Sequence, residues 1–308
     1  MRRVTQNPFP APPTLFGDQV LCGSCSETAS LRLLTGNLNL SVQVVQIPTV
    51  GFPLGFHLFY NAQDDVLTPA LGHKWQHQYQ MRLKFDAYPD PAQVTLVGPD
   101  AGRYGFTSGS SGWTRDPGYH FTPASLVEDS LADEWRLEFP GGSCFVFEAV
   151  ARGPVYEGRL VRLEDRHGNT LSLTWDSSDR LESPTAPTGR SLVLEYDPTT
   201  GGLTKLTFMP TSDPADKVVM GTFQVVDDEL TCLTGPEGCV QQYVYDSNHR
   251  IIKRKDPLLR ELSFGYDGSD RLTSVTDAGS PAATLSYSYD TVEEAMGDVG
   301  DEDHPTVV

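Results

Sequence analysis

The sequence has no apolar run long enough to cross a bilayer, and it has few basic residues for its length. No stretch of about 18 apolar residues occurs among its 308 residues, so nothing in it is expected to span a membrane. Acidic residues outnumber basic ones by 41 to 23, giving a formal net charge of −18. A field of this sign repels phosphate backbones and anionic lipid surfaces. Nucleic acid is therefore not expected as a partner, and the chain is not expected to insert into a membrane.

The start of the chain also lacks the apolar stretch of a signal peptide. Arg2 and Arg3 provide positive charge, but a Pro-rich segment follows them. Export of the protein would therefore use another route or an upstream segment.

Cysteine is scarce, and its five positions do not form a recognisable framework. An odd number at low density argues against a disulfide scaffold. The C-x-x-C pair could combine with two later cysteines as a zinc site, but the later spacing is not that of a zinc knuckle, and no His completes the set. A local disulfide or free thiols are favoured, and no metal is expected. The cysteines are Cys22, Cys25, Cys144, Cys232 and Cys239.

Motifs of the common enzyme classes are missing as well. There is no G-x-S-x-G elbow, G-x-G-x-x-G loop, phosphate loop or H-E-x-x-H helix. Carboxylate pairs such as Asp64-Asp65, Glu164-Asp165 and Asp227-Asp228 could in principle form a glycosidase site. Solvated turns in an acidic chain explain them better. We therefore expect no catalytic residues, no cofactor and no enzymatic activity.

His73 and His77 are four residues apart, which on a helix would place two imidazoles on one side for a metal ion. The segment instead has the pattern of a strand entered from a Gly turn. On a strand this spacing is about 13 Å, too far for one ion. A structural role is therefore favoured for both.

What the sequence does contain is turn residues and alternating apolar positions. Its 28 Gly and 23 Pro are spread along the chain, which suits short strands joined by turns. Alternation such as Leu171, Leu173 and Trp175 places the three side chains on one face of a strand. No stretch keeps a 3.6-residue period beyond a turn or two. The fold is therefore predicted to be all-β.

An internal repeat occupies the second half. An aromatic residue followed by an acid recurs at intervals of 19, 21, 49, 21 and 23 residues, and the 49 leaves room for two units with a degenerate marker near Val226-Asp227. Such periods indicate stacked supersecondary units. The aromatic markers are Tyr156, Trp175, Tyr196, Tyr245, Tyr266 and Tyr289.

Two further features keep register with the markers. A basic residue and an aliphatic follow most of them, and an Asp near a turn signal comes five residues after the aliphatic. Each unit is therefore predicted to be a β-hairpin whose returning strand ends in an aromatic residue. Stacking the hairpins would bury these aromatics in a ladder between neighbours. The acid at the turn is expected to accept backbone N–H bonds. These residues are Arg159, Arg180, Arg250, Arg271, Asp165, Asp256 and Asp277.

The segments YDSNHRIIKRKDPLLRELSFGYD and YDGSDRLTSVTDAGSPAATLSYSYD closely resemble the YD repeats of Rhs proteins, wall-associated polymorphic toxins and teneurins. Upstream, TGNLNL, GFPLGFHLFYN, LGHKWQHQY, DAGRYGF and WRLEFPGGSCFVF resemble the segment that precedes such arrays. The resemblance implies a spiralling β-sheet shell built from stacked hairpins, which in bacterial members encloses a C-terminal toxin. It covers roughly residues 30 to 290.

We accordingly expect four parts: a Pro-rich leader (1–29), a β-rich N-terminal Rhs-type domain (30–150), a YD-repeat array (151–290) and an acidic tail (291–308). The resemblance implies a secreted or surface shell segment of a polymorphic toxin in interbacterial competition, with further repeat chain or a toxin effector as its partner. The alternative is a module that binds a cell-surface carbohydrate or protein through exposed aromatic and acidic residues. Because an array ends in an unpaired strand edge, self-association is also expected.

Overall fold

In a computed structural model, the chain is described over residues 26–32, 35–68, 70–116, 124–129, 132–279, 282–289 and 306–307. In these ranges the regular structure is antiparallel strand, with three short 3-10 helices and no α-helix. The all-β prediction is confirmed. No described helix has the length and apolar character needed to cross a membrane.

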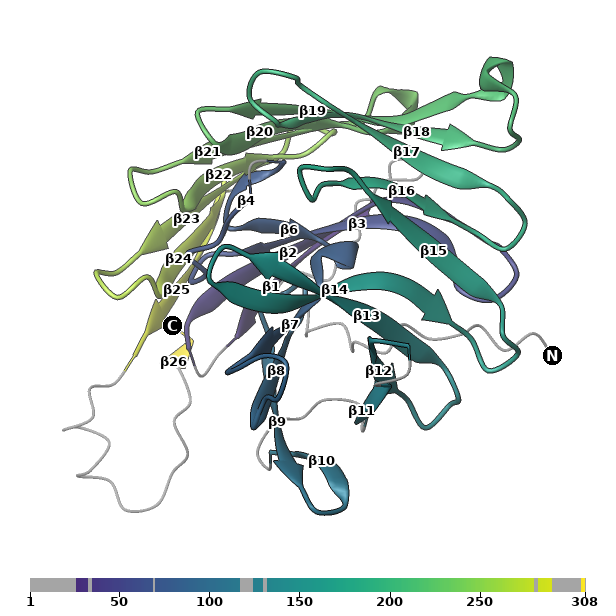
Figure 1. Ribbon diagram of the computed structural model, residues 1–308. Coiled ribbons are helices and arrows are strands. Elements are labelled where there is room, and N and C mark those ends of the chain that lie inside the picture. The colour runs from purple at the N-terminus through teal and green to yellow at the C-terminus, as the bar shows by residue number, and fades with distance from the viewer. Residues whose placement is uncertain are drawn as a thin grey trace, which may run out of the picture.

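A four-stranded sheet, the inner sheet, lies at the centre of the molecule (Figure 1). Its order is β1-β2-β3-β6. Its two central strands are long, and one of their faces is apolar and buried, with side chains such as Leu40, Val45, Phe56 and Leu58. The four strands are β1 (Ser26–Arg32), β2 (Asn37–Ile47), β3 (Leu54–Asn61) and β6 (Trp75–His77).

Eight strands form a second unit, the small barrel, in which neighbours in sequence pair in order and the last strand pairs back to the first. Trp135, Phe145 and Phe147 are among its buried side chains. The strands are β7 (Arg82–Phe85), β8 (Gln93–Val97), β9 (Arg103–Gly109), β10 (Gly112–Arg115), β11 (Ser125–Asp129), β12 (Glu134–Glu138), β13 (Cys144–Arg152) and β14 (Val155–Glu164).

The repeat array continues from β14 as a strongly curved antiparallel sheet that arches over the inner sheet (Figure 1). Stacked hairpins forming a spiralling sheet were predicted, and the structure confirms them. The strands are β15 (Thr170–Trp175), β16 (Leu181–Thr185), β17 (Ser191–Tyr196), β18 (Leu203–Met209), β19 (Val218–Val226), β20 (Glu229–Thr234), β21 (Val240–Tyr245), β22 (Ile251–Lys255), β23 (Glu261–Tyr266), β24 (Leu272–Asp277) and β25 (Ala283–Ser288).

Strand β14 joins the barrel to the array because it has two partners on one edge. Residues 157–159 pair with β7, and residues 162–164 pair with β15. The sheet therefore divides at β14.

The concave face of the array is covered by the inner sheet and the loop that follows it. Phe56 packs edge-on against Phe223 with ring centroids 6.2 Å apart, and Trp75 packs against Tyr243 at 5.2 Å. Short strands β4 (Leu67–Thr68) and β5 (Gly72–His73) extend this contact, and β5 pairs with β20. Over the described residues, the inside of this section is a packed core except for a cavity beside β15 and β16.

Two marker assignments need correction. Tyr156 lies inside β14, 41% exposed and stacked on Tyr88, so it does not precede a turn or belong to the core. Val226-Asp227 does mark the additional unit, but Asp227 and Asp228 form a two-residue turn with positive φ at both positions. That geometry is a tighter hairpin than the other units have.

His73 and His77 lie on different strands, β5 and β6, although the sequence pattern predicted one strand for both. Lys74 between β5 and β6 has φ of +66°, and the chain changes sheet there. The imidazole of His73 stacks on that of His249 with centroids 3.6 Å apart. His77 is buried against Phe56 in the inner sheet, and burial lowers its pKa to about 3.

Among the cysteines, Cys239 is disulfide-bonded, and Cys144 and Cys232 are free thiols. Burial raises the pKa of Cys144 to about 11, so its thiol is protonated at neutral pH. Cys22 and Cys25 lie outside the described residues, as do Asp290 and most of the acidic tail.

Candidate functional site

The marker acids organise the turns at one rim of the array, which we call the marker rim. In the turn after Trp175, the N–H of Asp179 donates to the carbonyl of Asp176, and Asp179 has φ of +59°. This is a type I turn followed by a left-handed residue, a common three-residue hairpin connection. The turns at Asp246 and Asp267 have the same bonds, with His249 and Asp270 in the left-handed position.

Each of these acids holds its turn through both carboxylate oxygens. Oδ1 of Asp267 accepts the N–H groups of Ser269 and Arg271, and Oδ2 accepts from Nε of Arg271 at 2.7 Å. Asp176 and Asp246 make the equivalent bonds to Arg180 and Arg250. Charged partners make such bonds about twice as strong as neutral ones.

The same turn occurs at the opposite rim. Asp256 accepts from the N–H groups of Leu258 and Arg260 and from Nε of Arg260, and Leu259 is left-handed with φ of +63°. Asp165 accepts from His167 and Asn169. Asp277 accepts from the N–H of Gly279. The pairing of Asp256 with Arg260 could have been found in the sequence, because it has the same four-residue spacing as Asp267 and Arg271.

The turn carboxylates make stability depend on pH. Burial tends to raise the pKa values of Asp176, Asp246 and Asp267, but bonds from arginine and backbone N–H groups outweigh it and lower them. Their contribution is therefore complete above the unfolded pKa of about 3.9 and is lost as pH falls through the lower folded values. We expect the free energy of unfolding, measured in urea, to fall between pH 5 and pH 2.

The control for this prediction is a chain with Asp176, Asp246 and Asp267 all changed to Asn. Asn has the same shape and keeps a side-chain oxygen that can accept the backbone N–H bonds, but it has no carboxyl group to titrate. This variant is expected to be less stable at pH 6 and to lose less stability on acidification. Parallel pH profiles for the two proteins would contradict the assignment.

The marker aromatics lie where neighbouring hairpins move apart. Within a hairpin the strands pair along their length, as β17 and β18 do over six register pairs. Between hairpins the pairing is confined to the end away from the marker rim, and β16 and β17 share only Thr185 with Ser191. The sheet therefore opens like a fan toward the marker rim.

At five of these openings, a marker aromatic fills the space and replaces the missing backbone bond. The hydroxyl of Tyr266 donates to the carbonyl of Ile251 at 2.9 Å, and that of Tyr245 donates to Leu230 at 2.6 Å. Nε1 of Trp175 does the same for Leu160. In each case the accepting carbonyl belongs to the aliphatic residue near the start of the preceding unit. The other two bonds run from Tyr196 to Leu181 and from Tyr289 to Leu272.

The marker arginines cover these aromatic rings. The guanidinium of Arg250 lies 4.8 Å from the ring centroid of Tyr266, and that of Arg271 lies 4.7 Å from Tyr289. Arg180 lies over Tyr196 in the same way, and Arg159 lies over Trp175 at 5.5 Å. Each contact is worth about 0.5 to 2 kcal/mol. One arginine thus links the turn of its own unit to the aromatic of the next.

Three N–H groups at the fan openings donate to oxygens of the inner sheet and its loops. The N–H of Leu203 donates to Ala70 and that of Leu272 to Gly36, both at 2.8 Å. The N–H of Ile251 donates to the hydroxyl of Tyr60 at 2.9 Å. No local pattern predicted these bonds, because their partners lie more than 100 residues apart.

Two glycines let the inner sheet approach this closely. Gly72 has φ of +83°, and a Cβ there would lie 2.3 Å from the carbonyl oxygen of Asp228. Gly36 has φ of +64°, and its Cβ would lie 2.6 Å from Cβ of Arg271. Only glycine fits such positions. They belong to the TGNLNL and LGHKWQHQY segments of the sequence.

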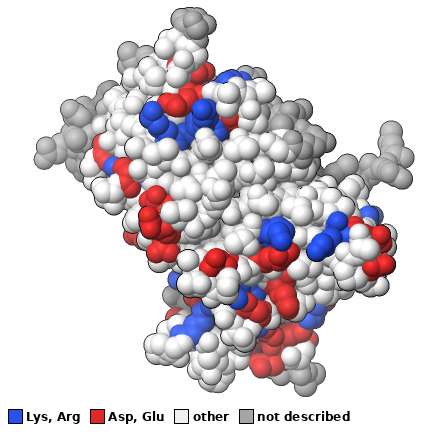
Figure 2. Space-filling model, turned by 90° about the horizontal axis from the view of Figure 1, so that it is seen from above, with Lys and Arg blue, Asp and Glu red and all other residues white. Residues whose placement is uncertain are grey.

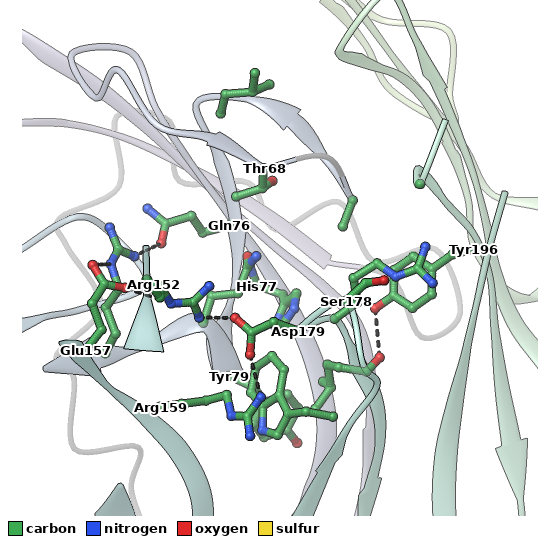
Figure 3. Close-up of a pocket in the computed structure, with 18 of the residues that line it drawn as sticks. Thr68, Gln76, His77, Tyr79, Arg152, Glu157, Arg159, Ser178, Asp179 and Tyr196 are labelled. Carbon is green, nitrogen blue, oxygen red and sulfur yellow. Dashed lines mark hydrogen bonds and ion pairs between the residues drawn. The ribbon is translucent and has the colours of Figure 1, made fainter. Parts of the chain in front are cut away.

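A cavity of about 660 Å³ lies beside the first two aromatics, where the sheet divides at β14 (Figure 3). Inner-sheet residues such as Gln76 and His77 line one side, and Trp175 and Tyr196 line the other. Arg152 forms ion pairs with Glu157 and Asp179, and Arg159 also pairs with Asp179.

Seen from above, the surface carries acidic and basic side chains in mixed clusters separated by wide areas with neither (Figure 2). One ion pair between neighbouring strands is Lys205 with Glu195 at 2.7 Å. Such exposed pairs contribute little to stability.

Comparison with known proteins gives two family matches. Residues 31–106 match the family described as a domain of unknown function, DUF6531, and residues 245–282 match the RHS repeat. No curated protein matches the chain.

Solved structures of similar shape include the TcdB2–TccC3–Cdc42 complex, with a TM-score of 0.38 and 13% identity over 87% of this chain and 13% of that one. The Photorhabdus luminescens Tc holotoxin pore has a TM-score of 0.37 and 12% identity, over 86% of this chain and 12% of that one. The chain thus spans a small part of the length of these structures. The family matches, one in the N-terminal segment and one in the array, place the chain among the Rhs/YD-repeat proteins.

Proposed function

We propose that this chain is a wall segment of an Rhs/YD-repeat shell, which packs with further repeat chain to enclose or present an effector and has no catalytic activity of its own. The observation that supports the proposal most is the repeated connection between units. Each marker aromatic from Trp175 onward bonds to the preceding hairpin, and each marker arginine covers the following aromatic. Polar groups of the ladder are thereby committed to holding hairpins together.

The last hairpin leaves a position where the wall can continue. Strand β25 pairs with β24 on one side, and on the other, among the residues that the structure describes, only Tyr287 and Ser288 pair, with β26 (Thr306–Val307). An antiparallel edge of this kind is a template for another strand. A following hairpin would fit the same register.

The packed inside of this section bears on what the wall encloses. Because the inner sheet fills the concave face, this segment leaves no room for an effector beneath it, and we propose that it forms a closed end of the shell. The enclosed space would lie beneath later repeats. A shell that carries a toxin to other cells would act outside the cell, so we propose a secreted or surface location.

The test of wall extension is to duplicate one unit. A second copy of residues 267–289 inserted directly after Tyr289 would restore the register, because the insert begins with the Asp of a marker turn. We expect an added hairpin that raises the unfolding temperature by about 2 to 4 °C for each kcal/mol gained, with the protein still monomeric by light scattering.

A matched insert with Ala in place of its one marker Tyr, the copy of Tyr289, is the control, since it has the same length without the bond to the preceding hairpin. It should give less stabilisation. If the unaltered insert lowers stability or remains unprotected in hydrogen exchange, the array does not extend through β25. The proposal that the wall encloses an effector is tested by the reading frame downstream. Further YD repeats followed by a domain of different composition favour enclosure.

A further inference from the structure

In three marker turns, the side chain of the left-handed residue bonds to a residue 20 positions earlier, in the preceding unit. In one of the three, the signs of the pair are exchanged, because His249 bonds through Nδ1 to the carboxylate of Glu229 at 3.0 Å. A histidine thus stands where the other two turns have an aspartate, and histidine is the side chain whose charge ordinarily changes between pH 5 and 8. The other two pairs are Asp179 with Arg159 and Asp270 with Arg250.

His249 is also the residue of this turn that contacts the loop after the inner sheet. Its ring stacks on that of His73, with centroids 3.6 Å apart and 12° between the ring planes. Beside the stack, the N–H of His73 donates to the carbonyl of Asp228 at 2.8 Å, and Gly72 pairs with Glu229. The two imidazoles therefore meet at the junction where β5 joins β20.

The charged groups around the stack oppose one another. Glu229 and Asp228 of the array contribute negative charge, and Lys74 of the loop contributes positive charge. Burial and the charge of His249 lower the pKa of His73, and the two carboxylates offset only part of this effect. A positive charge on His73 is therefore unfavourable in the intact junction. Two further ion pairs in the same turn and loop are Asp246 with Arg250 and Lys74 with Asp65.

We propose that the stack of His73 on His249 is an acid-sensitive latch, which holds β5 on the array at neutral pH and releases it when both imidazoles become cations. The first positive charge is tolerated on His249, because the carboxylate of Glu229 binds that ring. The second places two cations face to face at 3.6 Å, and like charges this close repel even in a solvent of high dielectric constant.

The direction of the pH dependence follows from the environment of His73. Its pKa in the folded chain is lowered, so the fold favours the neutral ring. The contribution of this ring to holding β5 is therefore complete above the unfolded pKa of about 6.5 and is lost as pH falls below that value.

Release of β5 would uncover a limited part of the core. Leu71 is fully buried beneath the loop, and the carbonyl of Ala70 accepts the N–H of Leu203 at 2.8 Å at a fan opening. The inner sheet has a separate anchor in the bond from Trp75 to Tyr245. The loop that carries β4 and β5 would therefore open while the inner sheet stays docked.

The experiment measures amide hydrogen exchange of the full chain at pH 7.5 and pH 5.0, corrected for the intrinsic exchange rates. Protection of the His73 amide should fall by about three- to tenfold at the lower pH, as linkage to one histidine allows. The amide of Leu272, which donates to Gly36 at another fan opening, should keep its protection.

Variants locate the effect in the stack. His73→Phe keeps an aromatic ring on His249 without a group that titrates, so the amide of residue 73 should be equally protected at both pH values. His249→Asn keeps a residue type that tolerates the left-handed conformation and removes the facing charge. By NMR, His73 should then titrate at a higher pH than in the unaltered chain. His167→Phe, in an exposed turn outside the junction, is the matched control and should leave the His73 response unchanged.

Three results would overturn the proposal: equal protection of the His73 amide at both pH values in the unaltered chain, the same loss in His73→Phe, or a parallel loss at Leu272. The last would mean that acid loosens the whole array. If His249→Asn lowers the unfolding temperature, the comparison of the unaltered chain with His73→Phe decides. None of these results bears on wall extension through β25, which is tested by the duplicated unit.

Discussion

Changing Trp75 to Ala is expected to lower the free energy of unfolding by about 3 to 5 kcal/mol, the range for removing a large buried aromatic. Trp75 is fully buried, with its ring 5.3 Å from that of Tyr60 and 5.2 Å from that of Tyr243. Its Nε1 also donates to the hydroxyl of Tyr245 at 2.9 Å. One side chain thus connects the inner sheet to the array. Urea unfolding followed by far-ultraviolet circular dichroism measures the loss.

Trp75→Phe is the matched control. Phe keeps an aromatic ring in the core and removes the hydrogen bond to Tyr245, so most of the packing should remain. Val218→Ala, at an exposed position on β19, should change stability by less than about 0.5 kcal/mol. If Trp75→Ala and Val218→Ala behave alike, the inner sheet is not anchored to the array through this residue.

Tyr266→Ala is expected to have an effect of similar size, about 3 to 5 kcal/mol. The substitution leaves an opening between two hairpins, removes the bond to the Ile251 carbonyl and takes away the ring beneath Arg250. Tyr266→Phe keeps the ring and should cost about 0.5 to 1.5 kcal/mol, the usual net value of one hydrogen bond. Thermal and urea unfolding distinguish the two variants.

Tyr156→Ala serves as the comparison, because Tyr156 has the marker sequence without the marker position. It is 41% exposed within β14, so its loss should be below about 1 kcal/mol. An unchanged stability in Tyr266→Ala would mean that the marker aromatics do not hold the hairpins together.

The sequence was sufficient for the features whose partners are close along the chain. The Asp267 turn is determined by five consecutive residues, and the alternation in β23 determines which side chains face inward. Both can be read without knowing the rest of the fold. Tyr156 was misread for the same reason, because an aromatic followed by an acid inside a strand looks identical to one before a turn.

The docking of the inner sheet could not be predicted in this way. Gly36, Tyr60 and Trp75 find their partners at Leu272, Ile251 and Tyr245, and no local pattern indicates such pairs. The cavity was missed as well, since it results from the division of the sheet at β14. The arginines were recognised as recurring residues, but their position over the following aromatic depends on how far neighbouring hairpins separate.

The distance in sequence between the inner sheet and its partners has a consequence for synthesis. Tyr60 bonds to Ile251 across 191 residues, and Gln63 bonds to Asp270 across 207. At about 5 to 20 residues per second, a ribosome takes roughly 10 to 40 seconds to make the intervening chain. For that interval the apolar faces of β2 and β3 have left the ribosome before the strands that cover them exist. The N-terminal quarter of the nascent chain is therefore the part most in need of a chaperone.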